Sequence, residues 1–204
     1  MLLEKVDLPE GESGDWRVEK FMVDRVDIRG LLHGRHVPKG RYTRLMRGTT
    51  VVMSDTPAEM REHYSAFRFA RGHCLINGLG LGMLLRNILR KDEVRSVTVI
   101  EQSKDVLKLV SPHYQDERVE FVHASAFDYK PPRGKRYEMV WHDIWDSICG
   151  DNLPAMHELH RKYGCRADWQ GSWARPECEQ ANRSWEAYRD KIQSRRAARR
   201  QVTQ

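Results

Sequence analysis

The sequence has no run of 18 apolar residues, so it predicts no membrane-spanning helix. Its N-terminus carries acidic residues early and lacks a long apolar stretch, unlike a signal peptide. The 204 residues include only four cysteines, none in a Cys-x-x-Cys pair, so we expect neither disulfides nor a metal site. These absences predict a cytoplasmic protein. The content of 40% apolar and 31% charged residues is typical of one globular domain with an embellishment.

A large excess of charge of one sign is also absent, since the formal net charge is only +6. Part of it is local, in an arginine cluster near the C-terminus that comprises Arg195, Arg196, Arg199 and Arg200. One interpretation of the cluster is weak contact with a nucleic-acid backbone. The other, which is commoner for such segments, is a solvated helix that frays at its end.

The first 55 residues predict a small antiparallel β extension. Residues 1–15 are rich in Glu, Gly and Asp, which is typical of a loose leader. Further along, an alternating strand is expected at 18–28, a glycine-rich loop at 30–40, and a hairpin with arms at 42–46 and 49–53.

A helix with clear start signals is expected next. Thr56 is a candidate N-cap, Pro57 suits the first helical position, and Glu59 would complete a capping box. We expect the helix to end at Gly72. Two of its residues, His63 and Tyr64, could reach a ligand, but such residues more often pack the helix against a sheet. Its predicted apolar stripe is Met60, Tyr64 and Phe67.

Beyond this helix, β-branched runs alternate with helical patterns, which predicts right-handed crossovers and a mostly parallel sheet. Strands are expected at 74–77, 95–101, 119–123 and 137–143, and 166–175 is either one more strand or an ordered loop. The carboxyl ends of parallel strands meet at one edge, where open α/β sheets bind ligands. The residues predicted at that edge are Asn77, Glu101, His123 and Asp143.

Three helices are expected within and after this alternation. The first is capped by Ser103, and the second begins near Asp151 or Asn152 and ends at Gly164. The apolar stripe expected on the second is Leu153, Met156, Leu159 or His160, and Tyr163. The third starts near Pro176 and would dock through Trp185, Tyr188 and Ile192. The chain then divides into a β extension at 1–55, a Rossmann-like domain at 56–175 and a basic helix or tail at 176–204.

The segment Cys74–Gly82 carries the most specific signal. It reads Cys-Leu-Ile-Asn-Gly-Leu-Gly-Leu-Gly and leads into a helical pattern, an arrangement that brings backbone close to a nucleotide-like ligand. Glycines at 78 and 80 would permit that approach, since a β-carbon would collide with the ligand. Glu101 ends the next strand about 20 residues on, where a ribose hydroxyl would need a carboxylate.

This Gly-x-Gly-x-Gly spacing resembles the first motif of class I S-adenosylmethionine-dependent methyltransferases. The resemblance implies an α/β, Rossmann-like methyltransferase fold and S-adenosylmethionine as cofactor. The third-strand exit resembles the family's adenine-binding segment, with Ser125 in place of the usual aspartate. The cofactor-binding residues that the resemblance implies are Asn77, Gly78, Gly80, Gly82, Glu101, Gln102, Ala124, Ser125, Ala126 and Phe127.

Residues 45–143 also resemble spermidine synthases, in the hairpin, a helix with Glu-His-Tyr, the glycine motif and Val-Ile-Glu. That branch transfers an aminopropyl group from decarboxylated S-adenosylmethionine, and its fourth strand ends in Asp-Ser-Ser-Asp-Pro. The corresponding segment here is His-Asp-Ile-Trp-Asp at 142–146, so only the first aspartate of that motif is present, as Asp143. The tryptophan-rich segments after Val140 resemble a small methyltransferase of the kind seen in phage genomes.

The function predicted is therefore methyl transfer to an unidentified small or macromolecular acceptor, which Asp143 would orient or deprotonate. An aminopropyltransferase and a non-catalytic module that binds nucleotides, nucleic acid or protein are the alternatives. Four tryptophans would either stack the acceptor or fill the core, and both options stay open: Trp141, Trp145, Trp169 and Trp173. Too few residues follow Gly164 for the family's seven strands, so we expect a sheet truncated at one edge or completed by a second copy in a homodimer.

Overall fold

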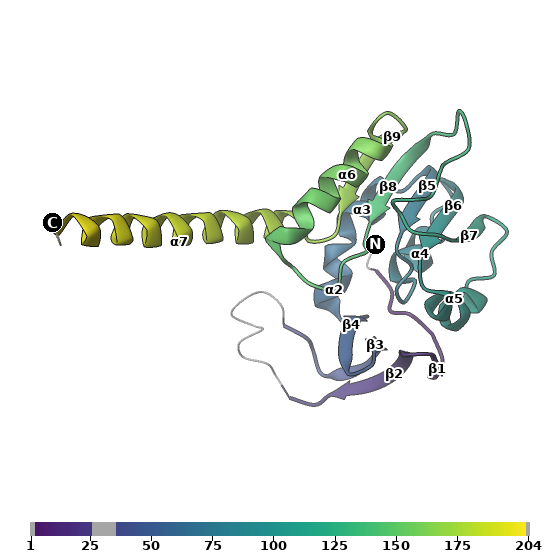
Figure 1. Ribbon diagram of the computed structural model, residues 1–204. Helices are drawn as coiled ribbons and strands as arrows, with labels where there is room; N and C mark the ends of the chain where they lie inside the picture. Colours follow the sequence, from purple (N-terminus) through teal and green to yellow (C-terminus); the bar gives the residue numbers. More distant parts are fainter. Residues whose placement is uncertain (1–2, 26–35, 203–204) are drawn as a thin grey trace.

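The protein is described by a computed structural model, which covers residues 3–25 and 36–202. It contains two sheets, connected by the short helices α2 (Pro57–Glu62) and α3 (Tyr64–Phe69). Figure 1 shows the smaller sheet below the larger one and the last helix projecting away from both. The expected loop at 30–40 and the end of the expected strand at 18–28 fall partly on residues 26–35, outside the described residues.

The smaller sheet is antiparallel, in the order β1-β2-β3-β4. Its predicted hairpin is confirmed, since β3 and β4 pair across Arg47 and Thr50. The loose leader predicted at 1–15 is wrong, because part of it pairs with β2 and because Val6 and Leu8 are buried in the core. The strands are β1 (Gly11–Ser13), β2 (Trp16–Val23), β3 (Gly40–Arg47) and β4 (Thr50–Ser54).

The larger sheet has five parallel strands in the order β7-β6-β5-β8-β9. This is the 3-2-1-4-5 order of a doubly wound sheet, and it confirms the predicted α/β, Rossmann-like fold class. The uncertain segment at 166–175 forms the edge strand β9, and the described residues add no strand beyond it. The strands are β5 (Gly72–Asn77), β6 (Val94–Glu101), β7 (Val119–His123), β8 (Tyr137–His142) and β9 (Ala167–Ser172).

Helices cover both faces of this sheet. Successive strand residues point to opposite sides, so each face carries apolar side chains that a helix buries. Cys74 and Ile76 belong to a core shared with α3, α4 (Met83–Ile88) and α5 (Lys104–Val110). Leu75 belongs to a second core on the other face, where α6 (Leu153–Gly164) contributes Leu159 and Tyr163. Short 3₁₀ turns, η1 (Ser111–His113) and η2 (Gly150–Asn152), follow α5 and precede α6.

The helix predicted from Thr56 is divided in two at His63, and its capping box is not formed. Thr56 makes no side-chain cap bond, and the Glu59 carboxylate instead accepts hydrogen bonds from the backbone N and Oγ of Ser54, both at 2.6 Å. The division turns Tyr64 outward, to 54% exposure, so its predicted place on the apolar stripe is wrong. In contrast, the Ser103 cap is confirmed, with Oγ 3.2 Å from the Val106 nitrogen.

The last helix, α7 (Arg175–Val202), begins where predicted but does not dock as predicted. Trp185 and Tyr188 are 63% and 55% exposed, so the stripe that was expected to pack on the body faces solvent. Only the start of the helix is anchored, through the fully buried Cys178. Figure 1 shows the rest of α7 extending away from the two sheets. The boundaries drawn at 55/56 and 175/176 stay a prediction.

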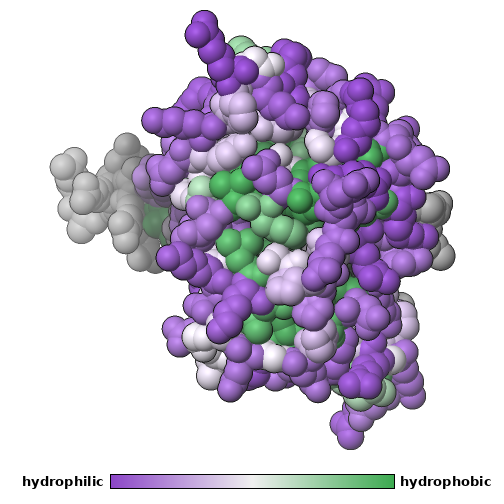
Figure 2. All heavy atoms as spheres, turned by 90° about the vertical axis from the view of Figure 1, so that its right-hand side faces the viewer, coloured by the Kyte–Doolittle hydropathy of each residue, from purple (hydrophilic) through white to green (hydrophobic). Residues whose placement is uncertain are grey.

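The surface of the protein is mostly polar or charged, as the composition predicts. The face drawn in Figure 2 is mostly hydrophilic, with a smaller hydrophobic area near its centre. All four cysteines are free. In the described part of the chain no helix is long and apolar enough to cross a membrane, and no group of three or more metal-ligating side chains comes together.

Candidate functional site

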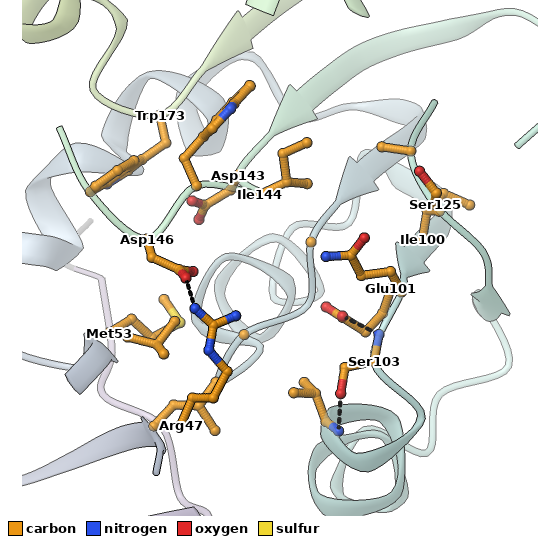
Figure 3. Close-up of a pocket in the computed structure, with 18 of the residues that line it drawn as sticks. Arg47, Met53, Ile100, Glu101, Ser103, Ser125, Asp143, Ile144, Asp146 and Trp173 are labelled. Atoms are coloured by element: carbon orange, nitrogen blue, oxygen red, sulfur yellow. Dashed lines mark hydrogen bonds and ion pairs between the residues drawn. The ribbon is translucent and has the colours of Figure 1, made fainter. Parts of the chain in front are cut away.

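A pocket of about 370 Å³ lies at the carboxyl edge of the parallel sheet. Its size is within the roughly 300–1,000 Å³ that small-molecule sites occupy. Figure 3 shows Glu101, Ser103 and Ser125 on one side of it and Asp143 and Trp173 on the other. The small antiparallel sheet contributes a third wall. The pocket thus combines chain segments more than a hundred residues apart.

The glycine segment enters this pocket directly after β5. Gly78 and Gly80 line it, with φ of +97° and +52°, values that side chains other than glycine rarely adopt. A β-carbon on Gly78 would overlap the Asp143 carbonyl oxygen, and one on Gly80 would overlap the Met53 sulfur. The loop therefore needs glycine for its own packing against the protein, in addition to any approach to a ligand.

Glu101 fixes the floor of the pocket next to the glycine loop. Its Oε2 accepts a hydrogen bond from the Leu79 nitrogen at 2.9 Å, and its Oε1 accepts one from the Ser103 nitrogen at 2.8 Å. The carboxylate is only 8% exposed, and each oxygen keeps a second lone pair. It can accept further hydrogen bonds from the hydroxyls of a ligand without releasing the loop.

The segment 124–127 forms the neighbouring wall. Ala124, Ser125, Ala126 and Phe127 all line the pocket, as does Gln102 from the β6 exit. The loop is held from behind, because the Ala126 carbonyl accepts hydrogen bonds from Lys162 Nζ at 3.0 Å and from Tyr163 Oη at 3.3 Å. A small, mostly apolar recess beside a carboxylate suits a flat heterocycle attached to a sugar.

Three residues that were predicted either at the sheet edge or in the cofactor site lie outside the pocket lining. Asn77 is fully buried, and its Nδ2 lies 2.8 Å from His142 Nδ1 within the protein interior. Gly82 faces the Tyr114 ring. His123 is exposed, with Nε2 3.0 Å from the Gln102 carbonyl oxygen. Asn77 still shapes the site through its backbone, since its carbonyl oxygen accepts the Asp143 N–H at 2.8 Å.

Asp143 is a strongly perturbed acid of the pocket. Burial raises its pKa to about 8, and the negative charges of Glu62, Glu59, Glu101 and Asp146 act in the same direction. The side chain is 19% exposed toward the pocket. At neutral pH the carboxyl group is therefore largely protonated, and a bound cation would favour its ionised form.

His63 stands against Asp143, with Nε2 3.7 Å from Oδ2. Burial lowers the pKa of His63 to about 4, so the imidazole is neutral at neutral pH. Its Nδ1 is buried without a hydrogen-bond partner among the described residues. The sequence left two alternatives for His63, helix packing and contact with a ligand, and the structure places it in the pocket lining at the break between α2 and α3.

The four tryptophans separate into two pairs. Trp141 and Trp169 are core residues whose rings stack with centroids 6.2 Å apart. Trp145 and Trp173 line the pocket, and Trp173 Nε1 donates a hydrogen bond to Glu62 Oε2 at 2.6 Å. The core alternative therefore applies to Trp141 and Trp169, whereas stacking of an acceptor by Trp145 and Trp173 stays a prediction.

The N-terminal extension supplies pocket residues that no sequence pattern predicted. Arg47 forms an ion pair with Asp146 across the pocket mouth, and Met53 packs on the glycine loop, where its sulfur lies 3.2 Å from the Leu81 nitrogen. Figure 3 shows both side chains below Asp143 and Asp146 in the left half of the view. Their contribution depends on how the two sheets pack, which no local pattern encodes.

No protein-family model and no curated protein matches this sequence. Among solved structures, it is similar to a spermidine synthase from Thermotoga maritima, with 20% identity, 74% of this chain and 52% of that chain covered, and a TM-score of 0.45. A spermidine synthase in complex with the transition-state analogue AdoDATO matches with 19% identity, 74% and 53% coverage, and a TM-score of 0.44. The 23S rRNA methyltransferase ErmE matches with 21% identity, 52% and 41% coverage, and a TM-score of 0.41.

The chain spans about half the length of the two spermidine synthases. Because all three TM-scores are below 0.5, we base no functional inference on these similarities. The function is inferred from the pocket itself.

Proposed function

We propose that this protein is an S-adenosylmethionine-dependent methyltransferase whose acceptor is unidentified. The observation that supports it is the convergence of Gly78, Gly80, Glu101 and Asp143 with the loop 124–127 on one pocket of about 370 Å³. These residues lie at the carboxyl ends of the four strands β5, β6, β7 and β8, and only the fold brings them together.

The pocket residues fit the proposed cofactor on chemical grounds. Glu101 offers two anchored oxygens to a ribose diol, and the recess at 124–127 has the small, apolar lining that an adenine ring needs. The carboxylates around Asp143 favour a cationic sulfonium over a phosphate. A dinucleotide pyrophosphate would meet those acids instead of a cluster of backbone N–H groups.

When bound, the cofactor would supply a methyl group already activated by its positive sulfur. The protein then has to hold the acceptor in line with that methyl group and exclude water. Asp143 would orient the acceptor and, once ionised, take its proton. Trp145 and Trp173 would cover the acceptor side, and Trp173 is fixed for this role by its bond to Glu62.

An aminopropyl transfer is the second candidate, and the acidic surroundings of Asp143 favour it specifically. A diamine is cationic at neutral pH, and the carboxylates that raise the pKa of Asp143 would attract it. The two candidates differ in the cofactor that they need, so binding experiments separate them. A non-catalytic module with the same fold would transfer neither a methyl nor an aminopropyl group, even if it bound one of the cofactors.

The test is calorimetry with S-adenosylmethionine, its demethylated product and its decarboxylated form. The methyltransferase proposal expects the first two to bind more tightly than the third, and the aminopropyl alternative expects the reverse. Ser125→Trp should abolish binding because the indole would fill the recess. His123→Trp, two residues away but exposed and outside the pocket lining, is the matched control. Absence of binding for all three compounds would contradict both enzyme functions.

A further inference from the structure

The helix α7 leaves the body of the protein soon after it begins. Its first turn is anchored near η2 by the fully buried Cys178, and Ala174, the residue before the helix, is also buried. Figure 1 shows the remainder of the helix extending outward without contact with either sheet. Packing against the body therefore does not explain which side chains this projecting segment carries.

Two large aromatic side chains stand on this projecting part. Trp185 and Tyr188 are 63% and 55% exposed, and their rings lie side by side with centroids 5.8 Å apart. They follow Cys178 by seven and ten residues, which places them on the same side of the helix as its buried anchor. The apolar face that holds the helix to the body thus continues beyond it and ends in two uncovered rings.

The same segment holds nearly all of the net charge of the chain. Residues 183–202 contain seven Arg or Lys and two Asp or Glu, whereas the whole protein has a net charge of only +6. Arg189 and Lys191, both exposed, immediately follow the aromatic pair, and the cluster of four arginines at 195–200 falls within the same helix. The body is close to neutral, so the charge is segregated to the projecting helix.

We propose that α7 is an arm that binds single-stranded nucleic acid. Trp185 and Tyr188 offer flat faces on which bases stack, and the basic residues that follow attract the phosphates. A second copy of the chain is a poorer occupant, because pairing two such helices would bring together two segments that each carry seven basic and two acidic residues. The arm is independent of the proposed methyl transfer.

The experiment uses the full chain and fluorescein-labelled 12-nucleotide uridine and thymidine strands, with anisotropy read at 50 and 200 mM salt. Binding should weaken as salt rises. Replacing Trp185 and Tyr188 with alanine should weaken it about tenfold or more, because each stacked base is lost. Replacing the four arginines at 195–200 with glutamine should flatten the salt dependence. The control is the Arg95→Gln, Arg136→Gln variant, which removes exposed charges from the body.

Equal binding by the aromatic variant and the control would overturn the proposal, as would no binding of either strand at 50 mM salt. Competition by poly-glutamate at equal charge concentration would show a general polyanion or acidic-protein surface and would also overturn it. Light scattering tests the remaining occupant: a dimer that the aromatic variant converts to monomer would assign the rings to a second copy. Calorimetry with S-adenosylmethionine should give the same affinity for these variants as for the wild type. Failure of the nucleic-acid proposal can therefore be distinguished from failure of the proposed function.

Discussion

Replacing Asp143 with asparagine should stabilise the protein while removing its proposed catalytic base. In the folded protein the carboxyl group holds its proton up to about pH 8, whereas in the unfolded chain it ionises near 3.8. Between these pH values the unfolded state lowers its free energy by releasing the proton, whereas the folded state keeps it. The stability of the wild-type protein therefore falls as pH rises. Asparagine has the same shape and no proton to lose, and therefore avoids this loss.

The size of the effect follows from the shift in pKa. At 1.36 kcal/mol per unit, a shift of about four units corresponds to an upper limit of about 5 kcal/mol at pH 8 and above. At pH 5 the same reasoning gives less than about 2 kcal/mol. Screening of the neighbouring carboxylates by salt reduces both values. We therefore expect the free energy of unfolding of Asp143→Asn to exceed that of the wild type by roughly 2–3 kcal/mol more at pH 8.5 than at pH 5.

The assay is urea unfolding followed by circular dichroism at both pH values. The control is Asp146→Asn, which also removes a carboxylate from the pocket mouth but at a side chain that is 36% exposed and paired with Arg47. Its effect should stay within about 1 kcal/mol at either pH. If Asp143→Asn destabilises the protein, or changes its stability equally at pH 5 and 8.5, the buried, protonated state of Asp143 is refuted.

Three further outcomes are expected. The affinity for S-adenosylmethionine relative to its uncharged demethylated product should rise severalfold in calorimetry between pH 6.5 and 9, because ionised Asp143 attracts the sulfonium; a constant ratio would contradict this. Gly78→Ala should prevent folding or lower the thermal midpoint sharply, because its β-carbon meets the Asp143 carbonyl, whereas Gly134→Ala, with a similar positive φ and open space, should cost only about 1 kcal/mol. Leu159→Ala should cost about 2–5 kcal/mol in urea unfolding, since Leu159 is fully buried between α6 and the sheet.

The parallel sheet could be predicted because its strands are short, buried and bounded by strong local signals. The β-branched run before Glu101 and the glycines after Asn77 each fix a strand end, and parallel strands bring those ends to one edge regardless of detail. The fate of individual side chains at that edge depends on tertiary contacts. Asn77 turns inward to His142 because a buried partner is available there.

Other features could not be read from local patterns. The acidic segment before residue 15 looks solvated, and only its pairing with β2 and the burial of Val6 and Leu8 make it part of the fold. The break at His63 has no glycine or proline to announce it. An apolar stripe on α7 indicates an amphipathic helix, but periodicity does not say whether Trp185 and Tyr188 are covered by the body.

The central claim is that the pocket beside Glu101 binds S-adenosylmethionine. Calorimetric titration of the full chain, of Ser125→Trp and of His123→Trp with this compound tests it most directly. The proposed function predicts saturable one-to-one binding to the wild type and to His123→Trp, and none to Ser125→Trp. Equal binding to all three proteins would place the cofactor elsewhere, and no binding to the wild type would contradict the function.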